Sequence, residues 1–166
     1  MGHTPLGKPH LIAVDTCVLM DLADHHPRGW AAVKALRAKY KGCQIVVLPT
    51  VLDELQFHSE GGGPPQKKRL STHALKKMLD WEFQPVDFIP VQHGIIEENA
   101  RHLLRKKVLP DTERNDALFL AEAGLYGCQI VLSNDAHIVN CDKELLRKVC
   151  LEQDLTELDI KHYGSR

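Results

Sequence analysis

Short apolar runs alternate along the chain with longer segments in which apolar residues recur every three or four positions. Four runs are too short for helices and predict buried strands: 11–15, 43–49, 85–90 and 128–133. Six segments have helical spacing and predict amphipathic helices: 29–42, 50–58, 67–80, 93–108, 111–127 and 143–150. Because buried strands alternate with helices, we expect an α/β fold, a three-layer α/β/α sandwich with a central, mostly parallel sheet.

Two segments between these elements stand apart from the alternation. Residues 59–69 contain three Gly and two Pro in succession and predict a loop, whereas the pattern at 156–163 is ambiguous. Thr50 and Asp53 have the form of a capping box at the start of the helix over 50–58. We therefore assign Asp53 a structural role as a helix cap.

The bulk composition is that of one domain without a strong charge. The chain has 166 residues, is 43% hydrophobic and carries a formal net charge of −1. This predicts a single domain over 10–166, preceded by a flexible tail at 1–9. No global field draws such a protein to nucleic acid or membranes, so any phosphate binding has to come from local patches.

The cysteines and histidines argue against a disulfide framework and against a zinc site. The five Cys form no C-x-x-C pair and their number is odd, which predicts reduced thiols in a cytoplasmic protein. The ten His include no zinc-like spacing. We see no signal peptide at the N-terminus and no apolar stretch long enough to span a membrane.

Acidic residues follow the predicted strands. Asp15 ends the first apolar run, Asp135 follows the last one, and Glu54 lies one turn into the helix after the second. Asp116 belongs to a predicted helix beside residues that should face the core. Each acid alone fits a cap, a turn or a solvated position. Ligands of open α/β sheets, however, bind outside the carboxyl ends of the strands. Acids that converge there without a basic partner indicate a hard divalent cation, Mg²⁺ or Mn²⁺.

The chain resembles the PIN-domain ribonucleases in four ordered segments, "VDTCVLMDL", "PTVLDEL", "RNDALFLAEA" and "VLSNDAHI". The resemblance covers nearly the whole chain and implies the α/β/α fold of that family. It implies metal-binding and catalytic roles for four acids: Asp15, Glu54, Asp116 and Asp135. It also implies supporting roles for three polar residues: Thr16, Ser133 and Asn134.

The resemblance further implies a metal-dependent endoribonuclease that hydrolyses single-stranded RNA and leaves a 5′-phosphate and a 3′-hydroxyl. Two Mg²⁺ or Mn²⁺ ions roughly 4 Å apart can clamp a phosphodiester, with one activating water and the other stabilising the leaving oxygen. Whether one ion or two is bound stays open. No nucleophilic side chain is needed, and we expect Cys17 to lie in the core.

Basic clusters are the candidates for RNA contacts. Lys67, Lys68 and Arg69 follow the glycine-rich loop and are the best candidates, because phosphate binding depends on local positive charge. Arg114 has three alternatives: it braces the acids, it contacts phosphate, or it pairs with Asp111.

The resemblance most often points to the toxin of a toxin–antitoxin pair, which implies RNA as substrate and a cognate antitoxin protein as partner, with a homodimer left open. A housekeeping RNA-processing nuclease is the near alternative. A non-catalytic module of the same fold that binds RNA or a partner is another. From a different class, a phosphotransfer domain also has an aspartate at a strand end. A haloacid-dehalogenase-like phosphatase, however, needs a second aspartate where this chain has Cys17.

Overall fold

The computed structural model describes residues 9–164, and the predicted tail at 1–9 lies outside the described residues except for Pro9. The sheet has five strands: β1 (Leu11–Val14), β2 (Gln44–Val47), β3 (Phe83–Pro85), β4 (Ile130–Leu132) and β5 (Asp159–Lys161). Their order is β3-β2-β1-β4-β5, and every neighbouring pair is parallel. The predicted α/β fold is confirmed, and the described sheet is parallel throughout.

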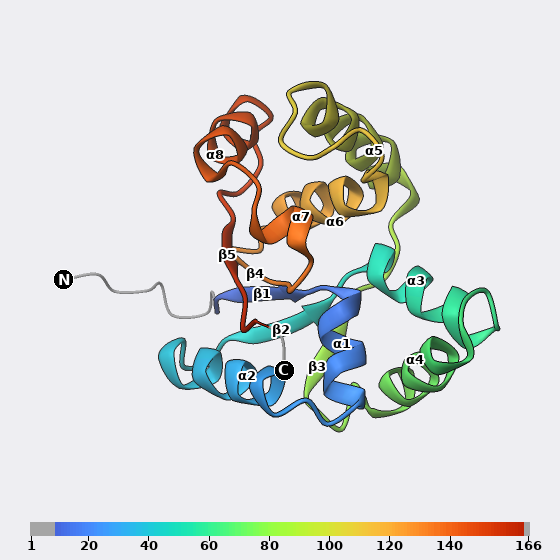
Figure 1. Cartoon of the computed structure of the whole chain (residues 1–166). Coiled ribbons are helices and arrows are strands. Elements are labelled where there is room, and N and C mark those ends of the chain that lie inside the picture. Colours follow the sequence, from blue (N-terminus) through green and yellow to red (C-terminus); the bar gives the residue numbers. More distant parts are fainter. Residues whose placement is uncertain (1–8, 165–166) are drawn as a thin grey trace.

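Helices cover both faces of this sheet. Those in the described part of the chain are α1 (Thr16–Ala23), α2 (Pro27–Lys39), α3 (Pro49–Ser59), α4 (Pro65–Lys77), α5 (Pro90–Arg105), α6 (Arg114–Leu125), α7 (Ala136–Val139) and α8 (Lys143–Glu152). Figure 1 shows α1, α2 and α4 on one side and α5, α6 and α8 on the other, which gives the expected three layers. No helix within residues 9–164 is long and apolar enough to cross a membrane.

The strand order reverses at β1. The chain adds β2 and then β3 on one side of β1, and it adds β4 and then β5 on the other side. The carboxyl ends of β1 and β4 therefore form the topological switch point, where ligands bind in open α/β sheets. The register pairs Val14 with Leu132. The residues that follow these two strands, Asp15 and Ser133, are thus brought side by side.

Several elements differ from the sequence predictions. The patterns do not predict α1, because six of its eight residues are buried and it shows no clear polar face. The predicted strand at 85–90 is wrong: β3 ends at Pro85, and α5 begins at Pro90, since proline suits the first turn of a helix. The ambiguous segment at 156–163 contains β5, an edge strand. Helix α4 begins at Pro65, so the loop predicted over 59–69 is shorter and its basic cluster lies on the helix.

The predicted capping box at Thr50 and Asp53 is also wrong. Helix α3 begins at Pro49 after Leu48, which makes no side-chain cap hydrogen bond. The backbone N–H of Thr50 donates instead to Oε1 of Glu122, on α6, at 2.9 Å. Burial raises the pKa of the Glu122 carboxyl, which is 3% exposed. A side chain from a distant helix thus satisfies the first turn of α3, and Asp53 is exposed at its surface.

Candidate active site

Asp15 lies at the switch point because β1 ends at Val14 and α1 begins at Thr16. The hydroxyl of Ser133 donates to Oδ2 of Asp15 at 2.7 Å. The backbone N–H of Thr16 donates to Oδ1 at 2.7 Å, so the same carboxylate caps α1. These two hydrogen bonds hold opposite oxygens of a side chain that is only 7% exposed. The orientation of the Asp15 carboxylate is therefore set before any ligand binds.

The surroundings of Asp15 favour a proton or a cation on this carboxylate. Burial raises the pKa of Asp15 to about 6, and the charges of Glu54 and Asp135 contribute to the rise. The hydrogen bonds from Ser133 and Thr16 act in the opposite direction and limit the shift. A buried carboxylate beside other carboxylates is stabilised when positive charge is placed next to it.

One cavity of about 440 Å³ brings the four predicted acids together. Its lining includes Asp15, Glu54, Asp116 and Asp135, which come from four separate segments of the chain. Glu54 is oriented by Thr16, whose hydroxyl donates to Oε2 of Glu54 at 3.0 Å. Thr16 therefore links two of the acids, one through its backbone and the other through its side chain.

Asp116 is the acid with the least satisfied carboxylate. It lies in the first turn of α6, where the following residues Ala117 and Leu120 are fully buried. Its Oδ2 atom is buried and has no hydrogen-bond partner among residues 9–164. Burial raises the pKa of Asp116 to about 8, and the carboxylates of Asp135 and Asp15 add to the rise. A buried acceptor without a donor destabilises the folded protein. Because the neighbouring groups are carboxylates, a cation is the partner that would stabilise this oxygen.

Asp135 has two roles in the structure. Its Oδ1 accepts a hydrogen bond from the backbone N–H of His137 at 2.9 Å, so it caps the short helix α7. It also lines the acidic cavity. Its own backbone N–H donates to the hydroxyl of Ser133 at 3.1 Å. Ser133 therefore positions both Asp15 and Asp135.

Asn134 supports the site from a distance and is not in the lining of the acidic cavity. Its Oδ1 accepts from the backbone N–H groups of Tyr163 and Gly164 at 3.1 and 3.2 Å. Its Nδ2 donates to the carbonyl of Gly164 at 2.7 Å. Asn134 therefore ties the segment after β5 to the segment that carries Asp135.

The basic residues lie at different distances from the acids. Lys67 lines the acidic cavity, whereas Lys68 is exposed on α4. A guanidinium nitrogen of Arg69 is 3.9 Å from Oδ1 of Asp24, which is another lining residue. All three residues share the first turns of α4. This helix therefore presents positive charge at the mouth of an acidic cavity.

Arg114 does not pair with Asp111, so that alternative is wrong. Asp111 accepts from Lys107 at 2.9 Å, since the two residues are four positions apart. A guanidinium nitrogen of Arg114 is instead 3.9 Å from Oε1 of Glu97 on α5. Arg114 is exposed and is not among the residues that line the acidic cavity.

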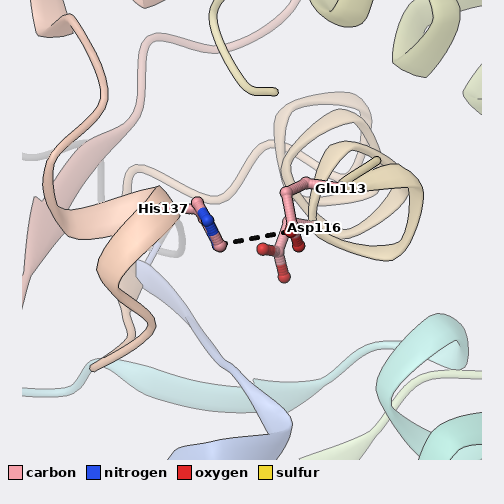
Figure 2. Close-up of side chains that lie close together, drawn as sticks. All are labelled: Glu113, Asp116 and His137. Carbon is pink, nitrogen blue, oxygen red and sulfur yellow. Dashed lines mark ion pairs between the residues drawn. The ribbon is translucent and has the colours of Figure 1, made fainter. Parts of the chain in front are cut away.

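Glu113 and His137 adjoin the acids and were missed by the sequence reasoning. Figure 2 shows both side chains turned toward Asp116, that of Glu113 from the residue before α6 and that of His137 from α7. The Nδ1 atom of His137 is 3.4 Å from Oε1 of Glu113 and 3.5 Å from Oδ1 of Asp135. The sequence contained a signal for Glu113: it precedes Asp116 by three positions in the helix predicted over 111–127, and this spacing places two side chains on one helix face.

Cys17 packs against the hydrophobic core, as expected, and it also lies at the edge of the site. It is partly exposed and lines the acidic cavity, with Sγ 3.7 Å from Oδ2 of Asp15. Burial raises the pKa of Cys17 to about 12, and the charge of Asp15 contributes. The thiol therefore stays protonated at neutral pH and is a poor nucleophile. All five cysteines are free, as the sequence predicts.

A second cavity, of about 450 Å³, adjoins the first. Both share Glu54 and His58 in their linings, and the second is also lined by Phe57. The glycine-rich segment between α3 and α4 packs against these rings. A Cβ atom at Gly62 would lie 2.4 Å from the Phe57 ring, and one at Gly63 would lie 2.7 Å from Nδ1 of His58. The glycines therefore allow a close approach that fixes the wall between the two cavities.

The sequence model of the PIN domain matches residues 12–144, and the chain therefore belongs to the PIN-domain family, whose members are typically metal-dependent nucleases. A comparison with curated protein sequences found no match. Among solved structures, the fold is similar to that of VapBC2 from Rickettsia felis bound to a DNA fragment from their promoter. That structure has a TM-score of 0.60 at 16% identity and covers 92% of this chain and 98% of its own.

Weaker similarities extend to two further structures. FitAcB from Neisseria gonorrhoeae has a TM-score of 0.48 at 15% identity, with 89% of this chain and 96% of that chain covered. FitAB bound to an IR36 DNA fragment has a TM-score of 0.46 at 14% identity, with 91% and 94% covered. At these identities, the similarity to the Rickettsia felis structure shows a shared fold.

Proposed function

We propose that the protein is a metal-dependent endoribonuclease that hydrolyses phosphodiester bonds of single-stranded RNA. The observation that carries the proposal is the cavity at the switch point, which gathers Asp15, Glu54, Asp116 and Asp135. The family of the chain supports the same chemistry. In this proposal the four acids are the metal-binding and catalytic residues.

The donor set fits a divalent cation. All four side chains offer carboxylate oxygens, which are the ligands that Mg²⁺ and Mn²⁺ take in proteins. The buried Oδ2 of Asp116 has no protein donor among the described residues, and burial raises the pKa of both Asp116 and Asp15. When bound, Mg²⁺ or Mn²⁺ supplies a Lewis acid that offsets charge on the phosphate and activates water.

The protein's own contribution is orientation. Ser133 and Thr16 hold the Asp15 carboxylate by hydrogen bonds to its two oxygens, and Thr16 also holds Glu54. Preorganised ligands of this kind need no rearrangement when a charged group arrives. The Cys17 thiol is protonated at neutral pH, so the proposal assigns the attack on phosphorus to water and not to a side chain.

RNA contacts are assigned to the basic residues on either side of the cavity. Lys67 is the strongest candidate because it lines the cavity itself, and Lys68 and Arg69 extend the positive charge along α4. Arg114 lies on α6, the helix that carries Asp116, and its pairing with Glu97 at 3.9 Å is loose enough to yield to a phosphate. These contacts read the RNA backbone and not its sequence.

In its more specific form, the proposal is that the protein is the toxin of a toxin–antitoxin pair. It entails a cognate antitoxin protein that covers the acidic cavity, and it leaves room for a homodimer of PIN domains. The overall similarity to VapBC2, bound in its solved structure to a promoter DNA fragment, supports this form. A processing nuclease of the same family and a non-catalytic binding module are the alternatives.

Cleavage of a single-stranded RNA by the purified protein tests the proposal, with neighbouring acids on α3 as a matched pair. Glu54→Gln should reduce cleavage at least 100-fold, because Glu54 lines the acidic cavity beside Thr16. Asp53→Asn removes the same charge one position away and should keep most of the activity, because Asp53 lies outside that cavity. Excess EDTA should abolish cleavage, and Cys17→Ser should retain it.

Mapping of new 5′ ends after brief expression in cells, beside an Asp15→Asn control, would identify the RNA that is cut. New ends that appear equally with Asp15→Asn would exclude this site as their source. Cleavage that persists in EDTA would contradict the metal-dependent mechanism. RNA binding without cleavage in either metal would favour the non-catalytic module.

A further inference from the structure

We propose that Glu113, Asp116 and His137 form a mixed nitrogen and oxygen side of the cation site, and that this side selects a divalent transition-metal ion such as Mn²⁺ over Mg²⁺. The inference deepens the proposed function and rests on it in one respect, that the acidic cavity binds a divalent cation. Glu113 and His137 are new to the site, and Asp116 is shared between it and the four acids.

The donor atoms of the three residues lie close enough together to approach one ion. One ligand atom from each of the three residues lies within 4.8 Å of the other two. Figure 2 shows the imidazole of His137 turned toward the carboxyl groups of Glu113 and Asp116, and its Nδ1 is 3.4 Å from Oε1 of Glu113. Donor atoms that share an ion with bonds of about 2.1 Å are about 3 to 4 Å apart. An ordinary N–H···O hydrogen bond is shorter, at about 2.9 Å.

A second observation points to a ligand at the same place. Oδ2 of Asp116 is buried and has no hydrogen-bond partner among the described residues. Glu113 does not relieve it, because an ionised carboxylate brings another negative charge and no hydrogen-bond donor. Buried polar atoms in folded proteins almost always have a partner. A cation held jointly by Glu113, Asp116 and His137 would supply one.

The backbone keeps His137 beside these acids. Asp135 caps α7 by accepting from the N–H of His137, so the start of that helix cannot move away without losing its cap. Glu113 is the cap residue just before α6, and Asp116 lies in the first turn of that helix. Two helix starts thus present their side chains to one another across the edge of the cavity.

An imidazole nitrogen changes which cation is preferred. Mg²⁺ takes oxygen ligands almost exclusively, keeps several waters and binds to proteins through one or two carboxylates. Carboxylates suit Mn²⁺ as they suit Mg²⁺, and imidazole suits the later transition metals best, but Mn²⁺ belongs to the same first-row series and binds mixed nitrogen and oxygen sites. Glu113, Asp116 and His137 supply two carboxylates and one imidazole, which is a ligand set suited to the transition metals.

Metal binding by the full-length protein tests this assignment without any RNA. Calorimetric titrations with MnCl₂ and with MgCl₂ would measure the two affinities. Pulsed electron paramagnetic resonance would detect a ¹⁴N nucleus directly bonded to Mn²⁺. His137→Ala should weaken Mn²⁺ binding about tenfold or more, in line with other single groups at metal sites, and change Mg²⁺ binding less than twofold. The ¹⁴N signal should disappear with it.

His93→Ala is the matched control. The two histidine side chains are similarly exposed, 49% for His93 and 46% for His137, and each pairs with a glutamate. His93 pairs with Glu97 on its own helix and does not line the acidic cavity. The control variant should keep both the Mn²⁺ affinity and the ¹⁴N signal. Glu113→Gln, a change that preserves size at the helix start, should also weaken Mn²⁺ more than Mg²⁺.

The outcomes separate this inference from the proposed function. No ¹⁴N signal in the wild type, or equal losses for Mn²⁺ and Mg²⁺ in His137→Ala, would overturn the inference even if the protein cleaves RNA in either metal. A ¹⁴N signal that depends on His137, in a protein that cleaves no RNA, would support the inference and remove the proposed function. Equal melting temperatures of the variants in EDTA would establish that folding is unaffected.

Discussion

At the scale of single residues, the acids of the cavity are arranged at a cost to the metal-free protein. Asp15 is satisfied by hydrogen bonds from Ser133 and Thr16, whereas Asp116 keeps a buried oxygen without a partner. Burial raises the pKa of Asp15 to about 6 and that of Asp116 to about 8. Sites that bind ligands commonly hold such unfavourable groups, and ligand binding relieves them.

The raised pKa values predict how stability depends on pH without metal. The folded protein binds protons at Asp15 and Asp116 more tightly than the unfolded chain does, so the free energy of unfolding should fall as pH rises from about 5 to about 8. Thermal melts in EDTA across this range would measure the fall. A melting temperature that rises over the same range would contradict it.

Asp116→Asn removes the least satisfied charge and should stabilise the metal-free protein at pH 8. Because Asp116 is only half-buried, screening reduces the gain to about 1 kcal/mol, or about 2 to 4 °C in melting temperature. Mn²⁺ should raise the melting temperature of the wild type by mass action and raise that of the variant less. Asp135→Asn is the comparison variant. It also removes one carboxylate charge from the cavity, but its Asn oxygen can still accept the cap hydrogen bond from the backbone N–H of His137. A lower melting temperature for Asp116→Asn in EDTA would mean that its charge is stabilising.

At the scale of elements, α6 is the helix on which the site depends most. Its first turn carries Asp116, with Glu113 at its cap position, and Glu122 farther along satisfies the start of α3, which carries Glu54. Near its end, Gly124 lets the segment before β5 approach, since the carbonyl of Gly124 accepts from Thr156 at 3.1 Å. The helix therefore connects the acids of one cavity to the placement of an edge strand.

Two glycine-to-alanine changes separate this packing role from helix propensity. A Cβ at Gly124 would lie 3.0 Å from Cβ of Leu155, whereas one at Gly94, in α5, would have nothing within 4 Å. Gly94→Ala should stabilise the protein by about 0.5 to 1 kcal/mol because alanine favours the helix. Gly124→Ala should lose about 1 kcal/mol, since crowding exceeds the same propensity gain. Urea titrations would compare them. An equal gain for both variants would mean that Leu155 moves aside freely.

At the scale of the whole molecule, charge is nearly balanced but unevenly placed. The net charge is −1, yet acids gather in one cavity while Lys67, Lys68 and Arg69 occupy the first turns of α4 at its mouth. A cavity of this kind repels an RNA backbone unless cations or nearby lysines compensate. Recognition should therefore depend on salt through a few local contacts and not through a field of the entire protein.

Neutralising the start of α4 should weaken RNA binding and flatten its salt dependence. Lys67→Gln with Lys68→Gln, made in the inactive Glu54→Gln background, should lower the slope of log affinity against log salt by about 1.4, since each of two phosphate contacts on a single strand contributes roughly 0.7. Lys76→Gln with Lys77→Gln removes the same charge from the last turn of the same helix and should change the slope little. Adding Arg69→Gln should deepen the first effect. Equal slopes for the two double variants would mean that Lys67 and Lys68 are ordinary solvent-exposed residues with no role in RNA binding.

The alternation of apolar runs and amphipathic segments determined the α/β fold and most of the elements by itself, because burial on both faces leaves a strong local pattern. The four acids could be picked out because strand ends and family segments are local features of the chain. Segments whose state depends on neighbours were mistaken or missed. The almost wholly buried α1 has little polar face to reveal it, and β5 becomes a strand only by pairing with β4.

Only the tertiary structure decided how the site is completed. Glu122 replaces the expected cap of α3 across 72 positions, and Ser133 reaches Asp15 across 118. The pattern of residues near each position carries no information about such partners, because the strand register and the helix packing create them. His137 likewise meets Glu113 only because two helix starts face one another at the switch point. The sequence determined which acids stand at the sheet edge, and folding determined what surrounds them.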